Sequence, residues 1–307
     1  MAHFEVVRRG ALTTVQDLGR WGWQSSGVQV AGPMDAYSHR LANRRAGNEE
    51  GAAALEITLT GPLLRAFGAV RCAIAGADFA VEVEGREIEA PAGFEVPDGA
   101  TLRLGVRRAG ARTTLAVRGG FDVPATFGSR ATCVVGRMGP FGGRAVKPGD
   151  ALAVADRPRV ALPAGRPLVL PQGGARLRVM MGPDESRFND EAMRRLLEAR
   201  FVVSPQSDRM GYRLDGEPLP APRRADMLSS PTPMGTIQVT PSGQPILLMA
   251  DRPTTGGYPR IATVITADLP FAGQLAPGEW IECAACTRAE AREALRMQEA
   301  ALAGDGC

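Results

Sequence analysis

Short runs of alternating apolar and polar residues dominate the chain, and glycine, proline and aspartate separate them. In the segment TLRLGV, Leu102, Leu104 and Val106 alternate with Arg103 and Arg107. The segments FAVEVEG, TTLAVRGG, RLRVMMGP and EWIECA continue the pattern. A period of two is typical of half-buried β-strands. Such runs recur about every ten residues, which favours β-barrels or sandwiches over βαβ units.

Three segments show a helical period instead. In PMDAYSHRLANRRAGN, Met34, Tyr37 and Leu41 share one face, and Gly47 is a candidate C′ residue. FNDEAMRRLLEARF contains Asn189 as a candidate N-cap, and TRAEAREALRMQEAALAG lies near the C-terminus. We therefore expect a mainly β fold with a few short helices.

The composition shifts between Ala155 and Leu177, a stretch rich in proline, glycine and arginine. A chain of 307 residues suits two domains of ordinary size. We place the boundary in this stretch and expect an N-terminal domain over 1–165 and a C-terminal domain over 166–307.

Charge and hydropathy exclude several classes of protein. The 36 basic and 33 acidic residues give a net charge of +3, which is too balanced for a nucleic-acid footprint. No apolar run is long enough to span a membrane, and the N-terminus MAHFEVVRRG lacks the pattern of a signal peptide. We therefore expect a cytoplasmic protein that binds neither nucleic acid nor membrane.

Lysine and histidine are too rare for several kinds of site. Lys147 is the sole lysine, so the chain has neither a P-loop nor the Met-Lys-Met context of a biotin carrier. The two histidines, His3 and His39, exclude a metal site built on several histidines, and we expect no metal. A Ser-His-Asp triad would have to use His39, which lies in a helix-like stretch.

Five cysteines at wide spacing fit a reduced cytosolic protein. Cys283 and Cys286 form a CxxC motif, followed by Thr287 and Glu290 at capping-box spacing. A helix start just after Cys286 would lower the pKa of its thiol. Further zinc ligands are not visible nearby, so we interpret the motif as structural, with a redox or metal role as the alternative.

Four glycine-rich polar stretches interrupt the strands: 12–35, 117–132, 204–216 and 233–260. Each mixes glycine, which permits close backbone approach to a ligand, with side chains that form directed hydrogen bonds. Ordinary loops of a β protein are the alternative interpretation. The last stretch is the least ordinary, because its polar cluster DRPTTGGYPR lies between two very apolar runs, ILLMA and IATVI.

Asp251 directly follows the first of these runs, so we expect it to be partly buried and to need a partner. Arg252, Arg260 or the backbone amides of Gly256 and Gly257 could supply one. Further hydroxyl groups come from Thr254, Thr255 and Tyr258. The set could hold a small polar molecule that carries an amide and a carboxylate.

The segments LTTVQDLGR, GPMD, LANRRAGNEEGAAALEITLTGP, GADF, SDRMGYRLDG, GTIQVTPSGQPILLMADRPTTGGYPRIATVITADLP and GQLAPG occur in this order. Together they closely resemble the biotin-dependent carboxyltransferase, or allophanate hydrolase subunit 2, family. That family includes the KipI antagonist and the C subunit of 5-oxoprolinase. The resemblance covers roughly 7–282.

The resemblance implies two cyclophilin-like β-barrel domains and a place in a complex. The implied partners are a KipI-like (allophanate hydrolase subunit 1) subunit and a LamB/YcsF-like subunit. The implied activity is that of a bacterial 5-oxoprolinase, which opens 5-oxoproline to L-glutamate at the expense of ATP. ATP is used by the complex, its site is not expected in this chain alone, and the chain carries no biotin of its own.

By the same resemblance, Asp251 is the leading candidate for binding the amide or urea nitrogen of the substrate. The other candidate substrate-binding residues are Arg252, Thr254, Thr255, Gly256, Gly257, Tyr258, Gln238, Arg209 and Asp35. Pro253 departs from the family, which usually has glutamine there, so a polar role at this position is in doubt.

Two alternatives to the hydrolase remain open. One is a biotin-dependent carboxyltransferase component that acts on urea or a related amide, with biotin supplied by another chain. The other is a non-catalytic protein that binds a KipI-like kinase inhibitor.

Overall fold

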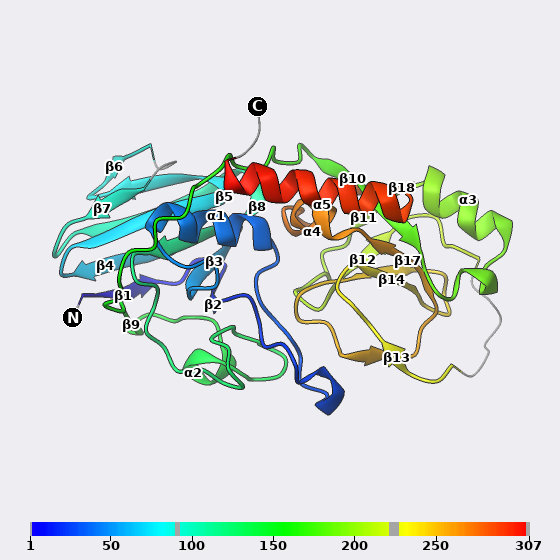
Figure 1. Ribbon diagram of the computed structural model, residues 1–307, viewed down its shortest axis with the longest axis horizontal. Helices are drawn as coiled ribbons and strands as arrows, with labels where there is room; N and C mark the ends of the chain where they lie inside the picture. Colours follow the sequence, from blue (N-terminus) through cyan, green and yellow to red (C-terminus); the bar gives the residue numbers. More distant parts are fainter. Residues whose placement is uncertain (1, 90–92, 221–226, 305–307) are drawn as a thin grey trace. The chain divides into compact units, whose positions relative to one another are not determined.

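The computed structural model describes residues 2–89, 93–220 and 227–304 (Figure 1). The chain forms two compact units. The first comprises Met1–Trp21, Ala31–Leu170 and Glu299–Cys307, and the second comprises Gly22–Val30 and Pro171–Gln298. These units are discontinuous in sequence, whereas the predicted domains, 1–165 and 166–307, are continuous.

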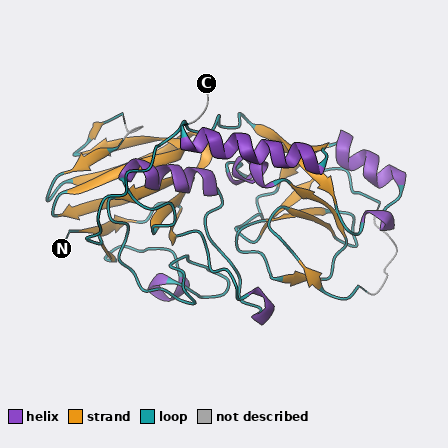
Figure 2. Cartoon of the chain, in the orientation of Figure 1, coloured by secondary structure: helices purple, strands orange, loops and turns teal. Residues whose placement is uncertain are grey.

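The first unit is built on a nine-stranded sheet (Figure 2). Its main path runs β2-β3-β8-β4-β1-β9, while β5 pairs with β6, β7 and β8. The strands are β1 (His3–Arg8), β2 (Leu12–Gln16), β3 (Ala54–Thr58), β4 (Leu63–Phe67), β5 (Val70–Val83), β6 (Arg86–Glu87), β7 (Phe94–Val96), β8 (Thr101–Val117) and β9 (Ala151–Ala153). The long strand β8 pairs with β5 along one edge and with β4 and then β3 along the other, so the sheet curls into a half-barrel.

The alternation predicted around TLRLGV is confirmed at its start and wrong at its end. Leu102 and Leu104 are fully buried, but Val106 is 66% exposed. The register explains the change, because Val81 on β5 faces Leu104 whereas Phe79 faces Arg107. Strand β8 therefore contains an extra residue at this point. Such a bulge turns the following side chains to the opposite face.

The helix α1 (Ala36–Ala46) packs on the strands β5 and β8 of this sheet (Figure 1). Its predicted face is confirmed, because Tyr37 and Leu41 are buried. Gly47 ends the helix at a φ of 79°, as predicted. The second helix assigned to this unit is the short α2 (Pro140–Gly143).

The second unit contains a closed barrel, β10-β17-β14-β15-β12-β11-β18. Its strands are β10 (Gly174–Met181), β11 (Arg200–Val203), β12 (Gly211–Asp215), β14 (Thr236–Val239), β15 (Pro245–Leu248), β17 (Arg260–Val264) and β18 (Trp280–Ala285). All neighbours are antiparallel except β10 and β18, which pair in parallel and close the ring. A separate ribbon joins β13 (Ser230–Pro231) to β16 (Thr255–Gly256). The mainly β prediction is confirmed, with one closed barrel and one curled half-barrel.

The helical segments of the second unit are short except at the C-terminal end. They are η1 (Gln24–Ser26), η2 (Glu185–Arg187), α3 (Asp190–Glu198), η3 (Thr266–Asp268), α4 (Leu269–Gly273) and α5 (Arg288–Ala303), whose last residues belong to the first unit. Asn189 caps α3 through a 2.9 Å bond from Ala192 N, as predicted. In the described parts of the chain, none of the helices combines the length and the apolar character needed to cross a membrane.

Candidate functional site

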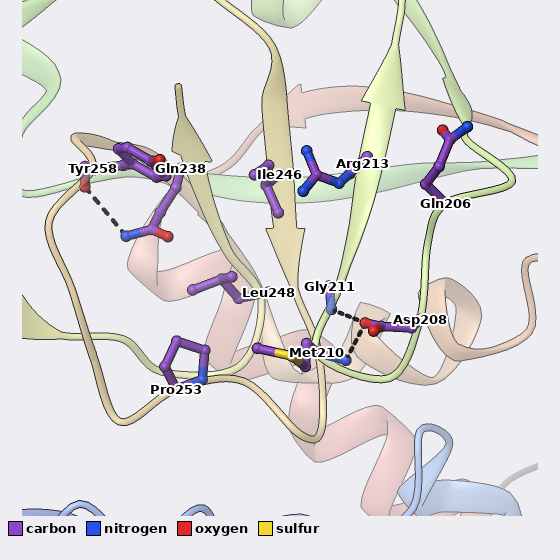
Figure 3. A pocket seen from close by; sticks show the side chains of 10 residues that line it. All are labelled: Gln206, Asp208, Met210, Gly211, Arg213, Gln238, Ile246, Leu248, Pro253 and Tyr258. Carbon is purple, nitrogen blue, oxygen red and sulfur yellow. Dashed lines mark hydrogen bonds between the residues drawn. The ribbon is translucent and has the colours of Figure 1, made fainter. Parts of the chain in front are cut away.

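A cavity of about 280 Å³ opens on the barrel of the second unit (Figure 3). Its walls come from three places: the approach to and body of β12, the strands β14 and β15, and the loop that follows β15. The lining residues are Gln206, Asp208, Met210, Gly211, Arg213, Gln238, Ile246, Leu248, Pro253 and Tyr258. Apolar side chains therefore form much of the wall, and a few polar groups converge on it, as is usual for a small-ligand site.

Arg213 supplies the cationic group of the cavity. It alternates along β12 with Tyr212 and Leu214, which are buried in the barrel, so its own side chain projects outward. In the described part of the chain its guanidinium has no hydrogen-bond or ion-pair partner. A guanidinium fork in this state suits a carboxylate ligand.

Asp208 fixes the turn that leads into β12. Its Oδ1 accepts hydrogen bonds from Met210 N at 2.7 Å and Gly211 N at 3.3 Å (Figure 3). Aspartate commonly holds the backbone two residues ahead in this way. The bond sets the start of the strand and thus the direction in which Arg213 projects.

Gln238 supplies an acceptor on the facing wall. Its Nε2 donates to Tyr258 O at 3.2 Å, and since a backbone carbonyl can only accept, Oε1 is left to accept from a ligand. A Cβ on Gly256 would lie 2.7 Å from this Nε2. Because Gly256 has no side chain, the amide group of Gln238 can occupy this position.

Asp251 is engaged by Arg209 and does not line the cavity. Its Oδ2 and Oδ1 accept from Arg209 Nε and Nη2 at 3.1 and 3.0 Å, and its side chain is 1% exposed. Neither Arg252, Arg260 nor the glycine amides, which the sequence suggested, provides the partner. The Asp251 carboxylate thus holds the side chain of Arg209. Arg209 directly precedes Met210, which lines the cavity.

The backbone joins the same two residues. Asp251 N donates to Arg209 O at 2.8 Å, and Met249 N donates to Met210 O at 2.9 Å. Gln29 Nε2 also donates to Asp251 O at 2.6 Å. These hydrogen bonds hold the turn before β12 against the loop after β15, next to Met210 of the cavity wall.

Most other residues of the predicted loop form hydrogen bonds that stabilise the loop itself. Arg252 donates from Nε to Thr232 O at 2.8 Å, and burial lowers the pKa of its guanidinium while the Asp251 charge opposes that shift. Thr254 O accepts from Thr232 N at 3.1 Å. Thr255 and Gly256 form the strand β16, and Gly257 is exposed. Of the loop residues proposed from sequence, only Tyr258 lines the cavity.

Arg260, the other suggested partner of Asp251, binds Asp184 instead. Its Nε donates to Asp184 Oδ2 at 2.8 Å, and its backbone N donates to the same oxygen at 3.1 Å. Burial alone would raise the pKa of Asp184, but these bonds hold it below its usual range. The pair fixes the start of β17.

Asp35 belongs to the first unit, where it caps α1. Its Oδ1 accepts from Ser38 N at 2.8 Å and its Oδ2 from Ser38 Oγ at 2.6 Å. This is the geometry of a helix N-cap. The N-cap role therefore explains an aspartate at this position without any contact to a substrate.

His39 lies on α1 and is fully buried. Its Nε2 is 3.2 Å from Asn43 Nδ2, and burial lowers the pKa of the ring to about 4. No group of three or more metal-ligating side chains comes together within the described ranges.

The predicted lowering of the Cys286 pKa is wrong. The capping box itself is present, since Thr287 Oγ1 accepts from Glu290 N at 3.2 Å. Partial burial nevertheless raises the pKa of the Cys286 thiol, and the Glu290 carboxylate raises it further. Cys283 is buried on β18, which raises the pKa of its thiol to about 12. A raised pKa disfavours the thiolate, which is the nucleophilic form of cysteine.

Of the candidate site residues proposed from the sequence, the cavity wall brings together Gln238 and Tyr258, and Pro253 lies in the same wall. Sequence reasoning missed Arg213, Asp208 and Gln206, which lie in or next to the quoted segment SDRMGYRLDG. The available signal was the alternation of that segment, because an arginine between two buried residues of a strand must point out of the core.

Comparison with known proteins identifies the family. The carboxyltransferase domain, subdomain A and B, matches residues 26–284. The chain is 37% identical over 298 residues to the C subunit of 5-oxoprolinase from Escherichia coli (strain K12), covering 96% of this chain and 95% of that protein. It is 33% identical to the C subunit of 5-oxoprolinase from Haemophilus influenzae, covering 93% and 92%.

A solved structure agrees. The crystal structure of the K. lactis urea amidolyase superposes with a TM-score of 0.92 at 32% identity, over 99% of this chain and 20% of that chain. The chain therefore corresponds to one part of a much longer enzyme there, and to nearly the whole of the two bacterial proteins. The chain belongs to the family of the carboxyltransferase domain, subdomains A and B.

Proposed function

We propose that this chain is the C subunit of an ATP-dependent 5-oxoprolinase. The complex would open 5-oxoproline to L-glutamate with a KipI-like subunit and a LamB/YcsF-like subunit. One observation carries the proposal: the match to the 5-oxoprolinase protein of Escherichia coli covers 96% of this chain and 95% of that protein. The match to the urea amidolyase, by contrast, covers only 20% of that chain, so the 5-oxoprolinase relatives support the proposal more directly.

The cavity chemistry supports this substrate. 5-Oxoproline is a five-membered lactam that carries one carboxylate. Arg213 lines the cavity, and its guanidinium would bind that carboxylate. Gln238 Oε1 would accept the lactam N–H. Ile246, Leu248 and Pro253 provide apolar surface for the ring methylenes. The chain would therefore bind and orient the lactam.

The cavity does not suit ATP. The one guanidinium of the lining matches a small monoanion, and the Asp208 carboxylate in the same lining would repel a triphosphate. A cavity of about 280 Å³ is also small for a nucleotide. ATP is a reactant of the assembled enzyme, and no step is assigned to it in this cavity.

A biotin-dependent carboxyltransferase that acts on urea is the second candidate. The similarity to the K. lactis urea amidolyase supports it. Biotin would then come from another chain, because the sole lysine, Lys147, lies in the segment AVKPGD. In this case Gln238 Oε1 would accept a urea N–H, but Arg213 would have no carboxylate to bind.

Arg213→Gln tests the assignment. We expect the KM of the reconstituted complex for 5-oxoproline to rise about tenfold or more, because a charge-assisted bond to the substrate is lost. The melting temperature should not change. Arg176→Gln, which removes an exposed arginine of β10 outside the cavity, is the control.

The readout is ATP-dependent glutamate release from 5-oxoproline, measured with and without this chain. Carboxylation of urea in the presence of a biotinylated carrier, with no glutamate release, would replace the hydrolase by the second candidate. An unchanged KM for Arg213→Gln would remove Arg213 from the site.

A further inference from the structure

The first unit contains a cavity of about 570 Å³ that none of the proposed chemistry uses. Three arginines, Arg71, Arg118 and Arg157, contribute to its wall, and we call them the arginine cluster. Glu95 and Asp156 also line it. The cluster gives the cavity an excess of positive charge.

Backbone pairing places the first two arginines side by side. Arg71 lies at the start of β5, and Arg118 directly follows β8. Cys72 faces Val117 in the antiparallel register, and Arg118 N donates to Arg71 O at 2.9 Å. Arg71 and Arg118 are therefore opposite each other, where like charges destabilise a sheet.

A glycine allows the third arginine to approach. Ala155 N donates to Gly120 O at 2.9 Å, which holds the segment after β9 against the end of β8. Gly119 has a φ of +92°, and a Cβ there would lie 1.9 Å from Ala155 O. The close contact is possible only without a side chain, and it brings Arg157 to the same cavity.

The two acidic residues of the cavity form no ion pair with the cluster and offset only two of its three charges. Within 2–89, 93–220 and 227–304, none of the three guanidinium groups has a hydrogen-bond or ion-pair partner. Glu95 faces Arg71 across β5 and β7, yet the two side chains form no ion pair. Three sets of N–H donors therefore remain available to a ligand.

We propose that the arginine cluster binds a phosphoryl group, carried by a small phosphate ester or present as free phosphate. A phosphoryl group has a charge of about −1.5 to −2 near neutral pH and three acceptor oxygens. Three guanidinium forks match it, whereas a single carboxylate is satisfied by one. The volume of the cavity leaves room for the organic part of an ester.

Calorimetric titration of the full chain at low ionic strength tests the proposal. The probes are ribose 5-phosphate, inorganic phosphate and, as the uncharged comparison, ribose. We expect both phosphates to bind and ribose not to bind. Tighter binding of ribose 5-phosphate would identify an ester as the ligand, and equal binding would identify free phosphate.

Arg71→Ala and Arg118→Ala should each weaken phosphate binding about tenfold or more. Arg65→Ala removes an exposed arginine from β4 of the same sheet, outside the cavity, and should leave binding unchanged. Arg157→Gln changes a residue outside the strands, so it provides the same test if a strand variant fails to fold.

Gly119→Ala keeps all three charges but forces the segment after β9 away, so it should also weaken binding. Wild-type protein that binds neither phosphate at millimolar concentration would overturn the proposal. So would an Arg157→Gln variant that binds as tightly as the wild type.

Discussion

Asp251 and Arg209 form a buried ion pair in which both carboxylate oxygens and two guanidinium nitrogens take part. The side chains are only 1% and 6% exposed. This arrangement favours a positioning role for Asp251 over direct contact with substrate. Loss of one partner would leave a charge buried without compensation.

Asp251→Asn should therefore lower the free energy of unfolding by about 3 kcal/mol, the lower end of the cost of breaking a buried pair. The melting temperature should fall by several degrees, while the folded fraction keeps kcat/KM within a few-fold. Urea denaturation and steady-state kinetics of one preparation measure the two effects.

Asp215→Asn, at an exposed position on β12, is the matched control and should change stability little. A variant of Asp251 that melts like the wild type but loses activity would restore the direct substrate contact that the sequence suggested.

At the scale of the element, α1 carries the ring of His39 into the core of the first unit. The Nδ1 of this ring has no partner among the described residues, and burial lowers its pKa to about 4 although the nearby Asp17 charge favours the protonated form. The ring is therefore neutral in the native state at neutral pH.

This burial should make stability depend on pH. Below a pH of about 6.5 the unfolded chain protonates His39 while the native chain does not, so the unfolded state binds more protons. Stability should fall as the pH falls from about 6.5 to about 4, with a total contribution from His39 of about 3 kcal/mol.

His39→Gln has no titratable ring and isolates this contribution. We expect urea denaturation to give a shallower dependence on pH for the variant than for the wild type across that window. Identical slopes would show that the ring is protonated equally in both states.

At the scale of the whole molecule, the sequence contains no P-loop motif. Lys147 remains the sole lysine, and both cysteines of the CxxC motif have a raised thiol pKa. The proposed function assigns the chain to a complex, and the prediction at this scale concerns the activity of the chain alone and its binding to a partner.

We expect the purified chain alone to release no glutamate from 5-oxoproline and ATP. Co-expressed with a KipI-like subunit, it should elute with that subunit during size-exclusion chromatography at micromolar concentration. Robust turnover by the chain alone, or separate elution of the two proteins, would contradict this expectation.

The elements that local chemistry specifies were readable from sequence. The periodic face of α1, the Asn189 cap of α3 and the Gly47 C-cap depend on residues a few positions apart. The alternation at Leu102 and Leu104 likewise reports the pleat of one strand. The mainly β class follows from such patterns, because a period of two places alternate side chains on opposite faces of a strand.

Contacts between distant segments were decided by the tertiary structure. Asp251 pairs with Arg209, 42 positions earlier, and the sequence offered nearer arginines as equally good partners. The bulge that exposes Val106 depends on β5, and the raised pKa of Cys286 depends on partial burial as well as on its helix. Charge and residue type show what a side chain can bind. Which group it binds is set by the packing of strands remote in sequence, since only that packing fixes distance and excludes water.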